Sequence, residues 1–243
     1  GSIYAVASRN LQVLHTVSKG ATGPSPRGQC FQSNDCDGPI LIDNLTCLQS
    51  DLLDPEDGVN FYKTRGAKDR PIVIQNSYFE GGGPSKSGCG ILLGDDDGSY
   101  QYALNNYLEA PGQCGIGMSG GSNNVIEGNV VYSPEVLPWS NVGIYVWDQH
   151  DSGCQTIEVK ENIVYFRNKG DFVNDRWFAS NCEVIHTGNE WLYEDLGRDA
   201  MLEYWNPDLP TNEPIPTTSP PTLPPTLPPS TQRWSCDCVA YEK

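Results

Sequence analysis

The sequence has few basic residues: 15 lysines and arginines stand against 31 aspartates and glutamates, for a formal net charge of -16. An acidic chain of this kind repels phosphate backbones and anionic lipid headgroups, so nucleic acid is not an expected partner. The sequence also lacks any run of about 18 consecutive apolar residues, and no basic segment precedes an apolar core near its start. Neither a membrane span nor an intact signal peptide is therefore expected.

Catalytic and metal-binding motifs are equally scarce. There is no Ser-His-Asp, Cys-His or phosphate-loop constellation. Most of the nine cysteines lie outside the CxxC and CxxH spacings of zinc sites, and only Cys236 and Cys238 are closely spaced. Such cysteines favour disulfides formed in an oxidising, extracellular compartment. Because their number is odd, at least one thiol is expected to be free or bonded to another chain.

Amphipathic helical patterns are missing as well, and a repeat of short β-prone runs takes their place. A glycine precedes such a run six times, at spacings of 30, 32, 25, 28 and 27 residues. A second β-prone run in each interval carries one asparagine, 14 to 19 residues after the glycine. The glycines are Gly28, Gly58, Gly90, Gly115, Gly143 and Gly170.

This repeat predicts an all-β fold, a right-handed parallel β-helix of about six coils. Equivalent residues of neighbouring coils should stack at roughly 4.8 Å, so like residues form columns. A β-sandwich with ordinary Asn and Gly turns is the alternative fold. The recurring asparagines are expected to form an inward hydrogen-bonded ladder of Asn44, Asn76, Asn106, Asn129, Asn162 and Asn189.

The cysteines provide a separate prediction of the register. Cys89 and Cys114 each directly precede a repeat glycine, whereas Cys154 and Cys182 follow theirs by 11 and 12 residues. Each pair should meet across adjacent coils within disulfide distance. We therefore predict the bridges Cys89–Cys114 and Cys154–Cys182. The sequence leaves open the pairing of Cys30, Cys36, Cys47, Cys236 and Cys238.

The chain is expected to have five segments. Residues 1–27 should form an N-terminal strand and cap, residues 28–192 the β-helix, and residues 193–206 a C-terminal cap containing a short helix. Ten of the 19 prolines fall between residues 207 and 229. Residues 207–232 are therefore expected to be an extended Pro/Thr-rich tail of polyproline II type, followed by a Cys-containing segment at 233–243.

Ser/Thr with Pro is also the composition of O-glycosylated stalks. An Asn-x-Thr sequon starts at Asn44, the same residue that is assigned to the inward ladder. An inward asparagine cannot carry a glycan, so one of the two predictions for Asn44 must be wrong. The glycosylation candidates are Asn44, Thr217, Thr218, Ser219, Thr222, Thr226 and Ser230.

The recurring Gly-Ile-x-Val/Leu and Ile/Val-x-x-Asn-x-Val-Tyr patterns resemble the pectate-lyase-like right-handed β-helix superfamily over about residues 28 to 192. The Thr-Leu-Pro-Pro repeats of the tail resemble hydroxyproline-rich and mucin-like extracellular glycoproteins. The superfamily contains lyases, hydrolases, epimerases, tailspikes, adhesins and structural fibres. The resemblance therefore implies the fold and leaves the function open.

The resemblance also implies a ridge where calcium-binding carboxylates and a base would lie. The position five residues after each glycine would form that ridge, with Asp148 and Asp175 as neighbours. Calcium ligands would be Asp95, Asp148 and Asp175, and catalytic candidates would be Asp148, His150 and Arg176. Tyr145 or Trp147 would be a sugar platform. The ridge positions are Ser33, Lys63, Asp95, Gly120, Asp148 and Asp175.

Two hypotheses about function follow. The favoured one is a secreted, glycosylated structural or interaction protein without a cofactor, a subunit of an extracellular filament, flagellar hair, sheath or adhesive. It would self-associate into a polymer or bind a related β-helix subunit. The alternative is a calcium-dependent polysaccharide lyase, hydrolase or C5-epimerase that acts on an acidic cell-wall glycan. Basic residues are scarce on the ridge, and neither an Asp-Pro-His epimerase motif nor a complete lyase signature is present, so enzymatic activity is not favoured.

Overall fold

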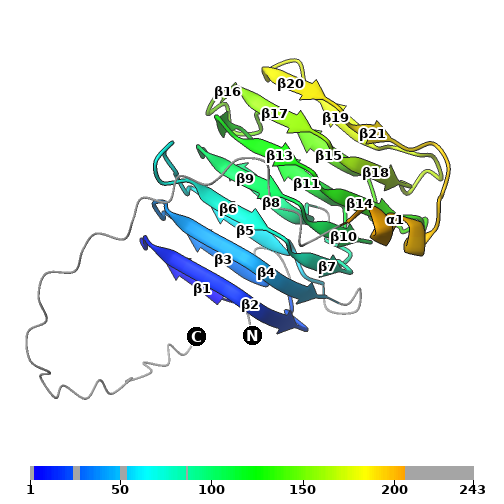
Figure 1. Cartoon of the computed structure of the whole chain (residues 1–243), viewed down its shortest axis with the longest axis horizontal. Coiled ribbons are helices and arrows are strands. Elements are labelled where there is room, and N and C mark those ends of the chain that lie inside the picture. Colours follow the sequence, from blue (N-terminus) through cyan, green and yellow to red (C-terminus); the bar gives the residue numbers. More distant parts are fainter. Residues whose placement is uncertain (1–2, 24–27, 50–53, 86, 206–243) are drawn as a thin grey trace, which may run out of the picture. The chain divides into compact units, whose positions relative to one another are not determined.

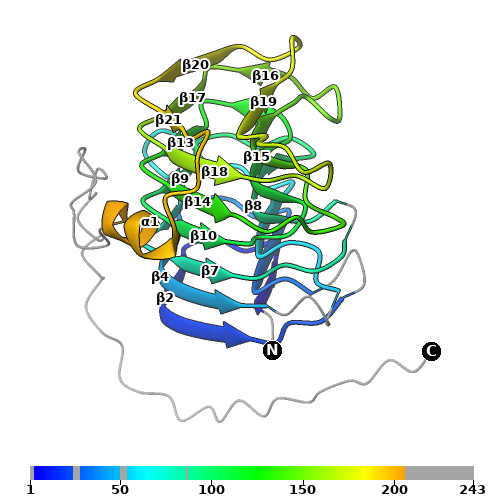
Figure 2. The same cartoon turned by 90° about the vertical axis from the view of Figure 1, so that its right-hand side faces the viewer.

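The computed structural model describes residues 3–23, 28–49, 54–85 and 87–205. These residues form an all-β parallel solenoid of about six turns (Figures 1 and 2), which confirms the predicted fold class. No helix in the described ranges is long and apolar enough to cross a membrane. The predicted tail (residues 207–232) and the predicted terminal segment (residues 233–243) lie outside the described residues. They contain Cys236, Cys238 and the glycosylation candidates Thr217, Thr218, Ser219, Thr222, Thr226 and Ser230.

One face of the solenoid is a seven-stranded sheet in which all neighbouring strands are parallel. Each turn contributes one strand, so this sheet runs along the whole stack (Figure 1). Its strands are β1 (Ile3–Val6), β3 (Phe31–Asn34), β5 (Val59–Tyr62), β8 (Cys89–Asp95), β11 (Cys114–Met118), β15 (Val142–Val146) and β19 (Arg176–Phe178).

A twelve-stranded sheet folds around a corner and forms the other two faces. The long strands β2 (Leu11–Lys19) and β4 (Ile40–Leu48) continue through the corner, and later turns break there into two strands. One arm contains β6 (Ile72–Gln75), β9 (Gln101–Leu104), β13 (Val125–Glu127), β17 (Ile157–Lys160) and β20 (Val184–Thr187). The other contains β7 (Tyr78–Glu80), β10 (Tyr107–Glu109), β14 (Val130–Ser133), β18 (Ile163–Phe166) and β21 (Glu190–Trp191), and a small separate sheet pairs β12 (Gly121–Ser122) with β16 (Cys154–Gln155).

The core consists of columns of apolar side chains that point into the solenoid. Ile91, Ile116 and Ile144 lie in register on β8, β11 and β15, and all three are fully buried. Successive side chains of a strand point to opposite faces, so the alternate residues face outward on the same strands. β-branched residues suit this half-buried, pleated surface, which is why they dominate the repeat.

The glycine repeat corresponds to a real column in the middle of the stack. A Cβ atom on Gly58 would lie 2.4 Å from the Gly90 carbonyl oxygen, and one on Gly115 would lie 2.4 Å from the Gly143 carbonyl oxygen, so no larger residue fits there. Gly58 and Gly143 belong to the same column, because the register pairs Val59 with Ile91 and Ile116 with Ile144. The predicted register therefore holds for these four turns.

The predicted register is wrong at both ends. Phe31 pairs with Val59, which places Cys30 rather than Gly28 beside Gly58. Arg176 pairs with Ile144, which places Asp175 rather than Gly170 in the glycine column. Gly28 and Gly170 lie two and five residues before the column position of their coils. Residue positions counted from these two glycines are therefore wrong.

The corner of the twelve-stranded sheet is held by an asparagine ladder. The side-chain amide of Asn106 donates to Asn129 Oδ1 at 2.9 Å, that of Asn129 to Asn162 at 2.9 Å, and that of Asn162 to Asn189 at 2.8 Å. The same Oδ1 atoms accept hydrogen bonds from corner backbone amides, as in the 3.0 Å bond from Asn106 N. The predicted ladder is confirmed for these four asparagines.

Asn44 and Asn76 are not members of the ladder, so this part of the prediction is wrong. They lie one residue earlier, at φ values of 56° and 49°, and Leu45 and Ser77 occupy the ladder column. Asparagine tolerates this left-handed conformation, so it suits both corner positions. Asn44 is exposed and its amide lies 3.0 Å from His15 Nδ1. Its place in the ladder is therefore the prediction that fails, and its glycosylation stays a prediction.

Disulfides connect neighbouring parts of the stack. Both predicted bridges are present: Cys89–Cys114, with Cα atoms 4.5 Å apart, and Cys154–Cys182, with Cα atoms 4.7 Å apart. A third joins Cys30 to Cys47 and so resolves part of the pairing that the sequence left open. Cys36 is buried as a free thiol.

The terminal segments differ from the predicted caps. Strands β1 and β2 pair in parallel with β3 and β4, so they form a first coil rather than a cap. The helix α1 (Arg198–Tyr204) lies against the flank of the stack beside β10 and β14 rather than over its end (Figure 2). Arg198 binds Glu109 at 2.8 Å, and Trp205 donates to the Asn105 carbonyl at 2.8 Å. The helix therefore ties the last coil to earlier ones.

Candidate functional site

One column of outward side chains crosses the seven-stranded sheet from the first coil to the last. It lies two residues after the glycine column, and every position is fixed by the strand register. Aromatic rings lie at both ends of this column, and two amide side chains lie near the end formed by the first coil. The column reads Tyr4, Gln32, Asn60, Leu92, Gly117, Tyr145 and Trp177.

A groove of about 470 Å³ lies over this column. Residues from the turns before β5 and β8 line one side, and residues at the ends of β5 and β8, with the loop after β15, line the other. A second hollow of about 220 Å³ shares Ser87, Tyr145 and Gln149 with the groove and extends to Trp147 and Trp177. Together they form a surface that runs along the axis of the solenoid.

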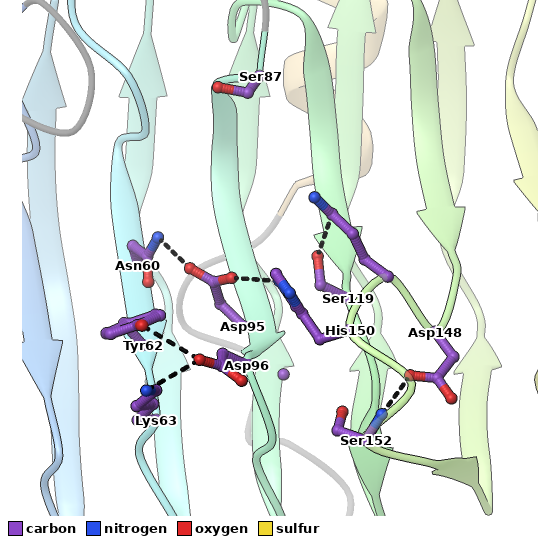
Figure 3. Close-up of polar contacts among 12 residues, drawn as sticks. Asn60, Tyr62, Lys63, Ser87, Asp95, Asp96, Ser119, Asp148, His150 and Ser152 are labelled. Carbon is purple, nitrogen blue, oxygen red and sulfur yellow. Dashed lines mark hydrogen bonds and ion pairs between the residues drawn. The ribbon is translucent and has the colours of Figure 1, made fainter.

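A chain of polar contacts links four side chains in the groove, three of which Figure 3 shows. The Asn60 amide donates to Asp57 Oδ2 at 3.0 Å and to Asp95 Oδ2 at 2.9 Å. His150 Nε2 lies 3.3 Å from Asp95 Oδ1. Two acids from different coils are thus connected through one amide, and a histidine lies at the open end.

Asp57 is the most strongly perturbed member of this chain. It is 1% exposed and accepts a hydrogen bond from the Cys89 backbone amide at 2.8 Å. Burial raises the pKa of Asp57 well above its usual range, because a charged carboxylate loses its hydration there. Asp57 therefore holds its proton to a higher pH than an exposed aspartate does.

Asn60 has an unused acceptor. It is 4% exposed, and its Oδ1 atom has no hydrogen-bond partner although the residue lines the groove. A buried polar atom without a partner costs about 1–3 kcal/mol, so Asn60 is held in place by its two hydrogen bonds at a local cost in stability. Nearby, the Tyr145 hydroxyl is 3.0 Å from Ser119 Oγ, which also donates to Gln149 at 3.3 Å.

The acidic ridge predicted from the sequence is only partly assembled. Asp95 lies in the groove, and Lys63, outside it, forms a 3.0 Å ion pair with Asp96 (Figure 3). Asp148 binds the backbone amides of Ser152 at 2.9 Å and Gly153 at 3.1 Å, so it closes its own turn. Gly120 lies beside that turn, since a Cβ atom there would be 3.3 Å from Asp148 Oδ1.

The predicted neighbours Asp148 and Asp175 do not meet. Asp175 lies beside Gly143, at the start of β15, whereas Asp148 follows the end of that strand. Asp175 is buried with an unpartnered Oδ1, and burial raises its pKa to about 6. In the described part of the chain, no three His, Cys, Asp or Glu side chains are grouped to hold a metal ion. The calcium set Asp95, Asp148 and Asp175 is therefore not assembled.

The predictions for the catalytic candidate Arg176 and for the ridge position Ser33 are also wrong. Arg176 belongs to an inward column, and its guanidinium lies 4.6 Å from the centre of the Trp191 ring, outside the groove lining. Ser33 is fully buried and bonds Thr64 at 2.8 Å. Both errors follow from the shifted register at the ends. Of the three catalytic candidates, only His150 lines the groove.

The sequence analysis named Tyr145, which lines the groove, but missed Asn60 on the groove floor. Both residues follow a column glycine by two residues, so the repeat contained the signal for this outward column. Asp57 and Trp177 had no such signal. Asp57 precedes its glycine, and Trp177 lies in the last coil, where the register shifts.

Comparisons with known proteins give no assignment: no protein-family model, curated protein or solved structure matches the chain. The chemistry of the surface must therefore indicate its ligand. Exposed aromatic rings offer flat apolar faces, and the amides and carboxyls between them offer hydrogen bonds. An elongated ligand with alternating apolar and hydroxyl-rich faces fits such a surface.

Proposed function

We propose that the chain is an extracellular interaction protein, of the adhesive or sheath type, that holds a saccharide chain along the outer face of the seven-stranded sheet. The outward column supports this proposal above all. Trp147 and Trp177 are 40% and 49% exposed and contact each other edge to face, with ring centroids 5.9 Å apart. Exposed tryptophans are costly in water and typical of recognition surfaces.

The dimensions of the surface also support a chain ligand rather than a small molecule. The column spans seven strands, which at the strand spacing of roughly 4.8 Å is about 29 Å of surface. Sugar rings stack their apolar faces on aromatic side chains, and their hydroxyls bond amides such as Gln32 and Gln149. The rigid sheet holds these groups at fixed spacing, which reduces the entropy cost of binding.

Secretion is part of the proposal. Three disulfides are compatible with an oxidising compartment. The exposed Asn44 of the sequon adds a place where a covalent glycan could be attached.

Binding is favoured over the alternative of calcium-dependent turnover of an acidic glycan. That alternative needs Asp95, Asp148 and Asp175 around one ion, and the strand register separates Asp175 from the other two. Of the candidate bases, Arg176 stacks on Trp191, and His150 lies in the groove with its Nε2 atom 3.3 Å from Asp95.

The proposal is tested by calorimetric titration of the full chain with hexasaccharides of glucosamine, N-acetylglucosamine and galacturonic acid. We expect the chain to bind at least one of them, and Trp177→Ala to lower that affinity tenfold or more. The matched control is Tyr193→Ala, since Tyr193 is 78% exposed and lies outside both hollows. The saccharide proposal would be overturned if the chain bound none of the three hexasaccharides. It would also be overturned if the chain bound a peptide with the sequence of residues 219–229 and no saccharide.

A second candidate function, assembly with other β-helix subunits, is favoured by the first coil. No described strand pairs with the outer edges of β1 and β2. Ile3 belongs to a core column yet is 36% exposed, whereas Phe31 and Val59 of the same column are buried. An open strand edge above an apolar core is a ready site for pairing with another chain.

The two ends of the stack differ, which gives this second proposal a specific test. Arg176 occupies the column of Ile3 in the last coil, and His186 occupies a column that Val159 fills in the coil before. The variant Ile3→Arg copies that polar ending. We expect sedimentation velocity to show assemblies of the full chain that Ile3→Arg dissociates and the control Leu14→Arg does not. A monomer at all concentrations would rule assembly out.

A further inference from the structure

We infer that the surface selects extended saccharide chains over short sugars, and that Gly117 sets this preference by making room for the ring of Tyr145. This inference rests on the proposed saccharide binding and adds the class of ligand and a positioning residue. It follows from the clash that any side chain at Gly117 would cause, from the hydrogen bonds around Tyr145, and from the place of that ring between the two hollows.

Gly117 is the one glycine among the seven residues of the outward column. A glycine inside a strand gives up a packing side chain, and it often marks a place where another group approaches the backbone closely. That group here is the Tyr145 ring of the next coil. A Cβ atom on Gly117 would lie 2.6 Å from Tyr145 Cε1 and 2.8 Å from its hydroxyl oxygen. The ring therefore occupies the space that a side chain at Gly117 would need.

Hydrogen bonds hold the Tyr145 ring in this place. Its hydroxyl lies 3.0 Å from Ser119 Oγ, on the same coil as Gly117. Ser119 is fully buried and donates to Gln149 at 3.3 Å, and the Gln149 backbone amide donates to the Ser119 carbonyl at 3.2 Å. The ring is thus fixed at its base by β15 and at its tip by the preceding coil. A ring that is fixed before binding loses little conformational entropy when a ligand stacks on it.

The position of this ring joins the two hollows. Tyr145 is the one residue of the outward column that lines both of them, since Leu92 lines only the groove and Trp177 only the second hollow. Leu92 and Trp177 are three coils apart, which is about 14 Å at the strand spacing. The Tyr145 ring covers the gap that Gly117 leaves between them. A long saccharide chain can therefore contact both hollows through this ring, whereas a short one contacts a single hollow.

The backbone of Gly117 is held from both sides. Its strand β11 pairs with β8 on one side and with β15 on the other. Gly117→Ala should therefore displace the Tyr145 ring rather than the strand, and should break the contact of the ring with Ser119. Both hollows remain in this variant, but the stacking surface between them is interrupted.

The test compares ligands of two lengths on the full chain: the hexasaccharides and the disaccharides of glucosamine, N-acetylglucosamine and galacturonic acid. Calorimetry measures the hexasaccharides, and NMR titration measures the weaker disaccharides. We expect the parent chain to bind a hexasaccharide about tenfold or more tightly than the disaccharide of the same sugar. Gly117→Ala should weaken the hexasaccharide about tenfold and change the affinity for the disaccharide less than about twofold. Equal losses for both lengths, or an unchanged hexasaccharide, would overturn the inference.

A double-mutant cycle separates the positioning of Tyr145 from a general loss of structure. Tyr145→Ala removes the ring that a Cβ atom on Gly117 would meet. Adding Gly117→Ala to Tyr145→Ala should therefore change the hexasaccharide affinity less than about twofold, because the residue that Gly117 positions is already absent. If Gly117→Ala lowered the affinity equally with and without the Tyr145 ring, Gly117 would not act through that ring and the inference would fail.

The matched control is Gly197→Ala, the same substitution at a residue outside both hollows. A Cβ atom there meets nothing within 4 Å, but the φ of 82° is strained for alanine, so melting curves should show a loss of stability. Its affinity for both lengths should equal that of the parent chain. A loss of hexasaccharide affinity as large as that of Gly117→Ala would overturn the inference. If the parent chain bound none of the six saccharides, the proposed function itself would be lost.

Discussion

The asparagine ladder provides a sharp test of the corner, because the sequence alone does not distinguish Asn129 from Asn76. Asn129 is fully buried. Its amide donates to the Ala103 carbonyl at 2.9 Å and to Asn162 at 2.9 Å, and its Oδ1 accepts from the Asn106 backbone at 3.0 Å. Asn129→Ala leaves these groups buried without partners and without room for bulk water.

The expected cost follows from those contacts. Each buried polar group that loses its partner costs about 1–3 kcal/mol. Two or three such groups predict that Asn129→Ala lowers the free energy of unfolding by about 3–5 kcal/mol, a large part of the total stability of a typical domain. Asn76 instead lies at φ 49°, the same corner position that Gly128 occupies at φ 66°. Asn76→Gly keeps this backbone conformation and removes two partly buried hydrogen bonds, to Asp43 and from Asn105, so it should cost about 1–2 kcal/mol.

The assay is urea unfolding of both variants without reductant, followed by circular dichroism and tryptophan fluorescence. A shift in midpoint at unchanged slope reports stability. If Asn129→Ala were destabilised no more than Asn76→Gly, the hydrogen-bonded corner would not stabilise the stack, and the reasoning would be refuted.

Three further predictions concern single elements. Burial raises the pKa of Asp175 to about 6, so the folded chain binds the carboxyl proton more tightly than the unfolded chain does. The stability that this proton contributes to the folded chain is lost as the pH rises through 6. Asp175→Asn should therefore stabilise the protein by about 1–2 kcal/mol at pH 8 and not at pH 3.5, and equal shifts in melting curves at both pH values would contradict this. Trp205→Ala removes the hydrogen bond to the Asn105 carbonyl and should cost about 2–3 kcal/mol in urea unfolding, with faster proteolysis near α1; parental stability would show that the helix is not a tie. Replacing Cys89 and Cys114 together by serine opens a loop of 25 residues and should cost about 3 kcal/mol in thermal unfolding, whereas an unchanged melting temperature would argue against the bridge.

The middle of the stack could be predicted from the sequence because its residues are fixed by local geometry. Gly58 and Gly115 are required where backbones approach too closely for a Cβ atom. Asn106 and Asn129 recur because the corner amides need an acceptor that water cannot provide. Such requirements repeat in each coil, so they give periodic signals.

The ends and the groove could not be predicted in the same way. Gly170 lies five residues before the column position of its coil, so positions counted from it put Asp175 and Arg176 in the wrong places. The pair Asp57 and Asp95 is joined through Asn60, and no spacing in the sequence specifies that contact. Contacts that skip a coil or depend on a single loop leave no repeat to detect.

The position of the bound saccharide tests the central claim most directly. Indole N–H signals of the full chain, assigned with Trp→Phe variants, can be followed by NMR during titration with the glucosamine hexamer. If the outer face of the seven-stranded sheet is the binding surface, the signals of Trp147 and Trp177 should shift with a single dissociation constant while that of Trp205, on the opposite flank beside α1, stays fixed. Shifts of Trp205 alone, or saturation without any change at Trp147 and Trp177, would contradict it.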